Sequence, residues 1–327
     1  MVQILTRKQG FILNLLLIIL LLTILGILSY YLYMNIPWGS QVLSLKIQAN
    51  QEFEITKLSG NVSQFYPNMK FNHNSISYKI DGNCNNEKKQ RITEAFIELA
   101  EKIGVINFYP VSENHDIEVS CTENFKDAIK KDFFIAGEGG AREIIQTGRY
   151  NIILNGIILL FANPQKAVKC NWPNIEIHEL IHVFGFDHSQ NKESLMYPYL
   201  ETCDQKLDDS IINKLKELYS EENLPDLYFS NLSVIKKGRY LDFNMTIQNS
   251  GSIDAKNAKL AIMDDGEIAE TLNLSDLKFG AGIFMEIKNL KLIHRNPNEI
   301  KFLIDPSNSI KEINEENNIA FVDFGLE

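Results

Sequence analysis

The chain has 327 residues, of which 45% are hydrophobic and 23% are charged, and its formal net charge at pH 7 is -10. This composition is that of a folded protein and excludes global disorder, while the length suits two domains and a tail. The acidic balance excludes nucleic acid as the main partner.

The N-terminal segment predicts one transmembrane helix. Residues 11–34 are nearly all apolar, and a helix of that length crosses about 30 Å of hydrocarbon. Arg7 and Lys8 precede the segment, and no Lys or Arg follows until Lys46. The positive-inside bias therefore predicts a signal anchor in the cell membrane, with residues 1–10 as a cytoplasmic tail and the remainder extracellular. The alternative is a cleaved signal peptide.

Residues 35–71 show no clear periodicity, and we expect them to form a stalk. A folded α+β domain is expected over residues 72–220, where strand-like and helix-like patterns alternate. Gly137 to Gly140 indicate a loop before two expected strands. The expected strands are 76–80, 106–109, 116–121, 141–146 and 151–161, and the expected helices are Glu87 to Ile103, one from Pro173 or Asn174, and one from Asp208 or Asp209 to Tyr219.

A metal-binding motif lies in the middle helix. His178, Glu179, His182, Gly185 and His188 fit the spacing H-E-x-x-H-x-x-G-x-x-H. The first two histidines are four residues apart, so one helix face presents both imidazoles to one cation. Glycine tolerates a positive φ, which lets the chain turn and bring the third histidine back.

Three nitrogen ligands leave one coordination position open, which is typical of a catalytic zinc site. We therefore expect one Zn²⁺ held by His178, His182 and His188, and a zinc-bound water activated by Glu179 as general base. No acidic loop has the ordered ligand pattern of a calcium site, so calcium is left open.

Ser194-Leu195-Met196-Tyr197-Pro198 follows this motif, and together they resemble the metzincin metallopeptidases with their Met-turn. Leu195 to Tyr199 is similar to the matrixin branch. The resemblance implies a zincin-like fold that cleaves protein or peptide substrates. It also implies that Met196 forms the floor beneath the metal, and that Pro198 and Tyr199 line the pocket for the substrate side chain after the scissile bond. The family's inhibitory cysteine is absent from residues 36–72, which leaves the control of latency open.

All four cysteines lie in this domain, and an even number outside a membrane suggests disulfides. We favour Cys170 with Cys203, which bracket the motif and the Met-turn, and Cys84 with Cys121. Other pairings, or four buried free thiols, remain alternatives.

Residues 225–327 read as short strands separated by turn signals, which predicts an all-β immunoglobulin-like sandwich. Asn249-Ser250-Gly251 and the segment from Ile310 to Asn318 resemble the CARDB family of cell-adhesion-related domains. The resemblance implies a surface module without chemistry of its own that binds a surface partner.

Two functions fit the sequence. The first is a membrane-anchored, outward-facing zinc endopeptidase, with a cleaver of short peptides as a narrower alternative. The second is an adhesion or scaffold protein whose metzincin-like domain is inactive. Inactivation usually removes the base or a ligand, and here Glu179 and the three histidines are all present, so we favour the enzyme.

Overall fold

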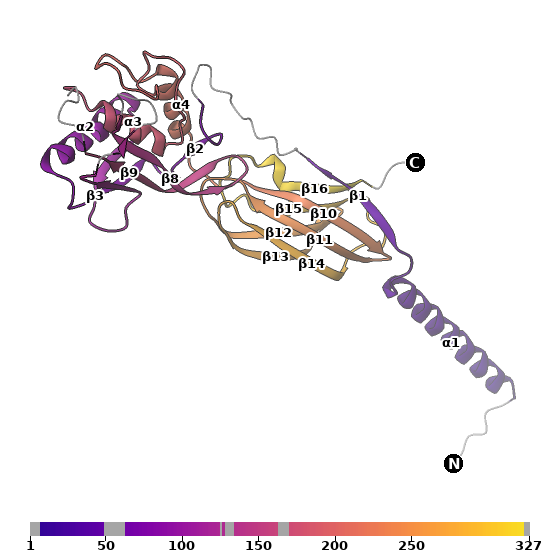
Figure 1. Ribbon diagram of the computed structural model, residues 1–327. Coiled ribbons are helices and arrows are strands. Elements are labelled where there is room, and N and C mark those ends of the chain that lie inside the picture. The colour runs from indigo at the N-terminus through magenta and orange to yellow at the C-terminus, as the bar shows by residue number, and fades with distance from the viewer. Residues whose placement is uncertain (1–6, 49–62, 125, 128–133, 163–169, 324–327) are drawn as a thin grey trace.

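The computed structural model describes residues 7–48, 63–124, 126–127, 134–162 and 170–323. Figure 1 shows an isolated helix at one end, a β-sandwich in the middle and an α/β domain at the far end. The helix, α1 (Arg7–Asn35), is the only one within the described residues that is long and apolar enough to cross a membrane. Its length and composition suit either a membrane anchor or a signal sequence. The expected cytoplasmic tail lies outside the described residues over 1–6.

The first domain is a mixed sheet covered by helices. Its strand order is β2-β9-β5-β3-β4, with parallel pairing throughout, and β8 pairs antiparallel along the other side of β9. The strands are β2 (Met69–Lys70), β3 (Ser75–Ile80), β4 (Asn107–Pro110), β5 (Ile117–Cys121), β8 (Gly137–Gln146) and β9 (Asn151–Leu160), and a separate two-stranded sheet is β6 (Lys126–Asp127) with β7 (Phe134–Ile135).

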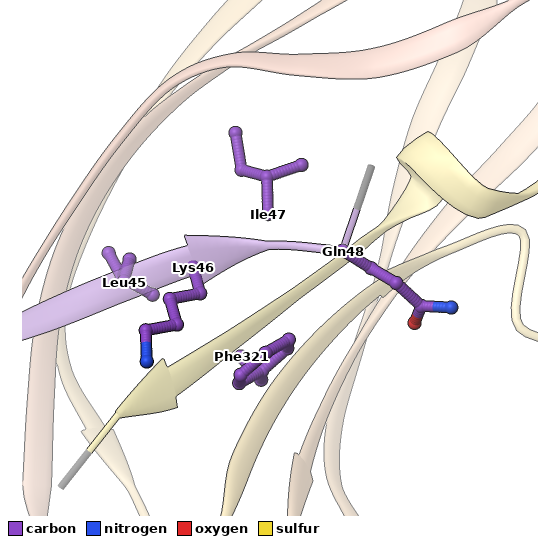
Figure 2. Close-up of a pocket in the computed structure, with 5 residues that line it drawn as sticks. All are labelled: Leu45, Lys46, Ile47, Gln48 and Phe321. Carbon is purple, nitrogen blue, oxygen red and sulfur yellow. The ribbon is translucent and has the colours of Figure 1, made fainter. Parts of the chain in front are cut away.

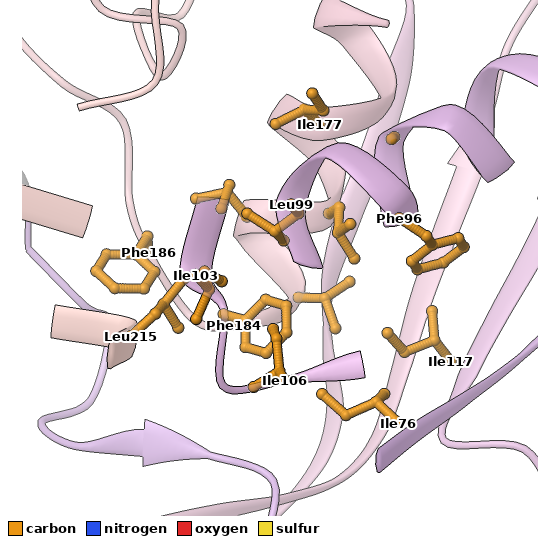
Figure 3. Close-up of a cluster of buried hydrophobic side chains, with 14 of the residues drawn as sticks. Ile76, Phe96, Leu99, Ile103, Ile106, Ile117, Ile177, Phe184, Phe186 and Leu215 are labelled. Atoms are coloured by element: carbon orange, nitrogen blue, oxygen red, sulfur yellow. The ribbon is translucent and has the colours of Figure 1, made fainter. Parts of the chain in front are cut away.

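Three helices complete this domain: α2 (Asn86–Ile103), α3 (Asn174–Val183) and α4 (Asp209–Ser220). Helix α2 begins where Asn85 caps the backbone N–H of Lys88, and it ends at Gly104 in the left-handed conformation. Its apolar face packs with residues of α3, α4 and the sheet in a single core (Figure 3), represented by Ile76, Phe96, Leu99, Ile117, Ile177 and Leu215. This core fixes α3, the helix that carries the metal-binding motif.

Glycines allow α3 to lie directly on the sheet. A Cβ at Gly156 of β9 would lie 2.3 Å from Val183 Cγ1, and a Cβ at Gly139 of β8 would lie 2.0 Å from the carbonyl oxygen of Glu179. The loop expected at Gly137 to Gly140 is wrong, because strand β8 already begins at Gly137. Glycine is depleted in strands, so a run of glycines indicates a loop. In β8 the glycines instead allow helix α3 to approach the strand closely.

The second domain is a β-sandwich with strand order β13-β12-β15-β16-β1-β10-β11-β14. Its two halves share a core that includes Phe243, Leu260 and Phe302. Its elements are β10 (Leu227–Lys237), β11 (Tyr240–Asn249), β12 (Ala255–Asp264), β13 (Glu267–Leu277), β14 (Gly282–Lys291), β15 (Ile300–Ile304), the 3-10 helix η1 (Glu316–Asn318) and β16 (Ile319–Asp323).

Strand β1 (Gln41–Ile47) belongs to this sandwich, although it follows α1 directly. Gln41 to Leu43 pair with β10, and Ser44 to Ile47 pair with β16. Leu43 is buried in the sandwich core. The end of β1 and Phe321 of β16 line an open hollow on the sandwich (Figure 2). The structure thus differs from the stalk expected over residues 35–71, because that segment supplies β1 to one domain and β2 to the other.

Candidate metal centre

Helix α3 and the turn after it bring three imidazoles together. His178 and His182 are buried on the helix, with 6% and 7% of their surface exposed. The helix ends at Val183, and Gly185 follows with φ +80°. The positive φ favours glycine there, and a Cβ would lie 2.1 Å from the sulfur of Met69, whose side chain would have to move. The chain then returns toward the helix and places His188 beside the other two.

The Nε2 atoms of the three histidines converge. They lie 3.1 Å apart for His178 and His182, 3.2 Å for His182 and His188, and 3.3 Å for His178 and His188. The Nδ1 atoms of His178 and His182 face the carbonyl oxygens of Leu195 and Phe186, each at 2.7 Å. A carbonyl only accepts, so each of these Nδ1 atoms carries the proton, and each Nε2 presents a lone pair to the centre.

All three imidazoles favour the neutral form. Burial and, to a smaller extent, the neighbouring His182 lower the pKa of His178 to about 3. Burial also lowers the pKa of His182 and of His188. Neutral imidazole is the form that binds a metal ion.

The site fits one zinc ion. Ligands about 2.0–2.1 Å from a tetrahedral zinc lie about 3.3 Å from one another, which matches the separations between the Nε2 atoms. The Nε2 lone pairs of His178 and His182 face each other and repel, and a shared cation removes that repulsion. Carbonyl partners on Nδ1 are also the usual outer contacts of metal-bound histidines.

Glu179 lies on a different face of α3, against β8. A Cβ at Gly137 would lie 2.7 Å from its Cγ, so the side chain lies directly on the strand. Burial raises the pKa of Glu179 to about 8, and the negative charge of Glu138 adds to this effect. The backbone N–H of Gly139 donates to the carboxylate and partly offsets the rise in pKa, because a hydrogen bond to the charged form stabilises it.

The segment after the motif contacts the histidine cluster, and the role of Met196 as a floor beneath the metal stays a prediction. Met196 is fully buried in the core, and its carbonyl accepts from the backbone N–H of Ser189 at 2.8 Å. Its neighbour Leu195 supplies the carbonyl that orients His178. Pro198 is exposed and Tyr199 half-buried, and their role as a pocket wall stays a prediction.

Two further residues hold this segment and were not identified from the sequence. The side chain of Gln205 is buried and donates to the carbonyls of Ser194 and Tyr199 at 3.1 and 3.2 Å. Asp208 accepts a hydrogen bond from the hydroxyl of Ser194. A buried glutamine that follows a Pro-containing turn gives no local sequence signal, so only the tertiary fold reveals its role.

Both favoured disulfides are present in the structure. Cys84 pairs with Cys121, and Cys170 pairs with Cys203. The first joins the start of α2 to the end of β5, and the second joins the segments before and after the motif.

A second group of metal-binding residue types lies in the sandwich. The ligand atoms of Asp264, Asp265 and His294 lie within 4.8 Å of one another. These groups already bond to each other and to the backbone, since Asp264 accepts from both the ring and the backbone N–H of His294. We assign no ion to this group.

Comparisons with known proteins identify both domains. The matrixin family model matches residues 70–220, and the CARDB family model matches residues 224–321. No curated protein matches the chain.

Solved structures similar to this chain correspond to its smaller domain. A domain of a protein described as a cell-surface protein, from Methanosarcina acetivorans, is 22% identical over 32% of this chain and 95% of its own, with a TM-score of 0.24. A CARDB domain from Pyrococcus furiosus, solved in complex with di-metal ions, is 17% identical over 31% of this chain and 91% of its own, also with a TM-score of 0.24. The family models carry the assignment: this chain is a matrixin-like, metallopeptidase-like domain followed by a CARDB domain.

Proposed function

We propose that this protein is a membrane-anchored, outward-facing, zinc-dependent endopeptidase. The observation that carries the proposal is the convergence of three neutral imidazoles, whose Nε2 atoms lie within 3.3 Å of each other beside a buried carboxylate. This donor set suits zinc with one open position, as in catalytic sites. The match of residues 70–220 to the matrixin family supports the same chemistry.

In this proposal the three histidines hold the metal and Glu179 moves the proton. A zinc ion at the three nitrogens would polarise a peptide carbonyl and increase the acidity of water. Glu179 accepts a proton from the attacking water and passes it to the leaving amine. The Gly139 N–H holds the carboxylate of Glu179 in place for both transfers. His178, His182 and Glu179 are buried, which strengthens their electrostatic interactions, while His188 is exposed to solvent.

The substrate would bind as an extended strand along β8. Among the described strands, β8 pairs only with β9, so its other edge is unpaired. An unpaired edge accepts an extended peptide through main-chain hydrogen bonds, whatever its side chains are. Because Gly137 and Gly139 of the same strand lie against Glu179, a peptide on β8 passes beside the proposed catalytic centre.

The second candidate, an adhesion or scaffold role, is supported by the CARDB match. We assign such a role to the sandwich alongside peptidase activity, with a surface partner as its ligand. An inactive α/β domain is the weaker alternative, because the complete histidine set and Glu179 are present.

Replacement of His188 tests the proposal. The wild-type ectodomain should bind about one zinc per chain, and His188→Ala should lower zinc affinity by more than the roughly 10–100-fold that loss of an outer contact costs. Peptidase activity should disappear with the metal. The measurements are elemental analysis and cleavage of a peptide library. His294→Ala is the matched control, since this exposed histidine lies in the sandwich. Full zinc occupancy in His188→Ala, or no zinc in the wild type, would contradict the proposal.

A further inference from the structure

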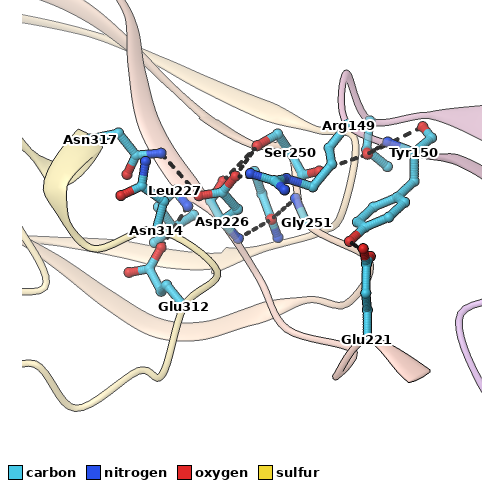
Figure 4. Close-up of polar contacts among 12 residues, drawn as sticks. Arg149, Tyr150, Glu221, Asp226, Leu227, Ser250, Gly251, Glu312, Asn314 and Asn317 are labelled. Atoms are coloured by element: carbon cyan, nitrogen blue, oxygen red, sulfur yellow. Dashed lines mark hydrogen bonds and ion pairs between the residues drawn. The ribbon is translucent and has the colours of Figure 1, made fainter. Parts of the chain in front are cut away.

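The hairpin that joins β8 to β9 extends from the matrixin-like domain onto the sandwich. The hydroxyl of Thr147 donates to the carbonyl of Ser250 at 2.7 Å, and both residues are buried. Arg149 lies with its Nε 3.7 Å from the carboxylate of Asp226, which is also fully buried (Figure 4). A buried polar contact of this kind fixes one element relative to another, because breaking it leaves a group without its partner.

The sandwich side of this contact is rigid. Asp226 accepts from the Ser250 hydroxyl at 2.8 Å and from the Asn317 side chain at 3.0 Å. The turn from Asn249 to Gly251 is held by side-chain and backbone hydrogen bonds to the start of β10. The hairpin therefore meets a preorganised surface built from three separate segments of the sandwich.

Packing adds to the polar contacts. A Cβ at Gly280 of the sandwich would lie 2.6 Å from Cγ2 of Ile145 and 3.2 Å from the carbonyl oxygen of Gln146. The end of β8 is thus pressed against sandwich backbone. On the hairpin itself, Thr147 also bonds the backbone of Tyr150, whose hydroxyl donates to Glu221 at 2.6 Å.

One strand connects this contact with the proposed catalytic centre. Strand β8 begins at Gly137, and both Gly137 and Gly139 lie against Glu179. It ends at Gln146, which contacts the sandwich at Gly280. A strand that pairs on one side only has no ladder hydrogen bonds along its free edge, so fewer bonds fix its position. Fixing its far end therefore limits how the whole strand moves relative to α3.

We propose that the sandwich clamps the β8–β9 hairpin and so holds the edge strand in position for substrate. The clamp consists of Thr147 and Arg149 on the hairpin and of Asp226, Ser250 and Gly280 on the sandwich. This inference rests on the proposed peptidase function, and it makes the sandwich part of the substrate-binding apparatus. The hairpin residues act as positioning residues, since they act through β8.

The test compares two double variants of the full ectodomain. Thr147→Val with Arg149→Met removes both polar contacts of the hairpin. Thr271→Val with Lys288→Met makes the same kinds of change at exposed positions of β13 and β14. We expect the hairpin variant to raise KM for an extended peptide by about threefold to tenfold, with kcat and zinc content unchanged. The single variant Thr147→Ser keeps both the hydroxyl and Arg149, so it should have the wild-type KM.

Hydrogen exchange provides a readout that does not need activity. Amides of residues 137–146 should exchange about tenfold faster in the hairpin variant, while those of α2 stay at the wild-type rate. Wild-type KM and wild-type exchange in a folded, zinc-loaded hairpin variant would overturn the clamp. If the wild type cleaves no peptide, the proposed function fails, and the exchange rates of β8 alone decide whether the sandwich holds this strand.

Discussion

His178 and Glu179 are neighbours on α3, yet the same burial prepares them for opposite tasks. Removal from water penalises charge, so it lowers the pKa of His178 to about 3 and raises that of Glu179 to about 8. The histidine is therefore neutral and able to bind a metal across the physiological range. The carboxyl group has a strong affinity for a proton, as a general base requires near neutral pH. Two titratable groups with pKa values moved apart in this way are typical of an acid–base centre.

Glu179→Gln separates the proton acceptor from the metal site. The amide keeps the shape and an oxygen that accepts from Gly139, so fold and zinc content should not change. Because the amide takes no proton, kcat should fall by about 10²–10⁴-fold. Elemental analysis and kcat on a cleaved peptide, measured on the same preparation, check both expectations. Glu138→Gln is the control, since it removes a nearby carboxylate of β8 and should leave most of the rate.

A variant with zinc and near wild-type kcat would show that Glu179 is not the base. Loss of zinc in Glu179→Gln would place this residue in the metal site instead.

At the scale of elements, local signals predicted the helices but missed four strands of the described residues, β1, β2, β6 and β7, and the first four residues of β8. Helix α2 (Asn86–Ile103) was expected from Glu87 to Ile103, because its apolar periodicity is a local signal. The convergence of the histidines was also predictable, since it needs only an i, i+4 spacing and a glycine turn. The glycines of β8 were assigned to a loop because their purpose, contact with α3, arises only in the folded domain. The support that Gln205 gives the Met-turn is likewise tertiary.

Gly139→Ala should disturb α3, whereas Gly140→Ala should not. A methyl group at Gly139 meets the backbone oxygen of Glu179 at 2.0 Å, while nothing lies within 4 Å of a Cβ at Gly140. The first change should lower the free energy of unfolding by about 1–3 kcal/mol and lower kcat, as overpacking against backbone does. The second should stay within about 0.5 kcal/mol. Denaturant unfolding and peptide cleavage measure both, and equal effects would refute the proposed packing of β8 on α3.

At the scale of the whole molecule, the sandwich lies between the apolar helix and the matrixin-like domain (Figure 1). Its contact with the helix includes Arg295, whose guanidinium carbon lies 4.2 Å from the ring centre of Tyr33. Its contact with the other domain includes Thr147 and Arg149 of the β8–β9 hairpin. The sequence did not predict this arrangement, because β1 finds its partners β10 and β16 only after the complete matrixin-like domain has intervened.

Protease added outside intact cells should remove most of the chain and leave a short protected N-terminal fragment. The reason is the apolar helix with Arg7 and Lys8 before it, which favours an anchor with an outward-facing ectodomain. Immunoblotting against tags at either end follows the two parts. Release of an intact ectodomain that begins near residues 35 to 45 would favour a cleaved signal peptide instead.

The position of β1 also sets an order of assembly during synthesis. Ile47 leaves the ribosome long before Leu227, and at about 5–20 residues per second the interval is on the order of ten seconds or more. The matrixin-like domain, whose hydrophobic core lies within residues made in that interval, can fold while β1 still lacks its partners. The sandwich closes last, when β16 reaches β1. Any delay in translating the C-terminal third therefore prolongs the time in which a folded matrixin-like domain exists without its contact to the sandwich.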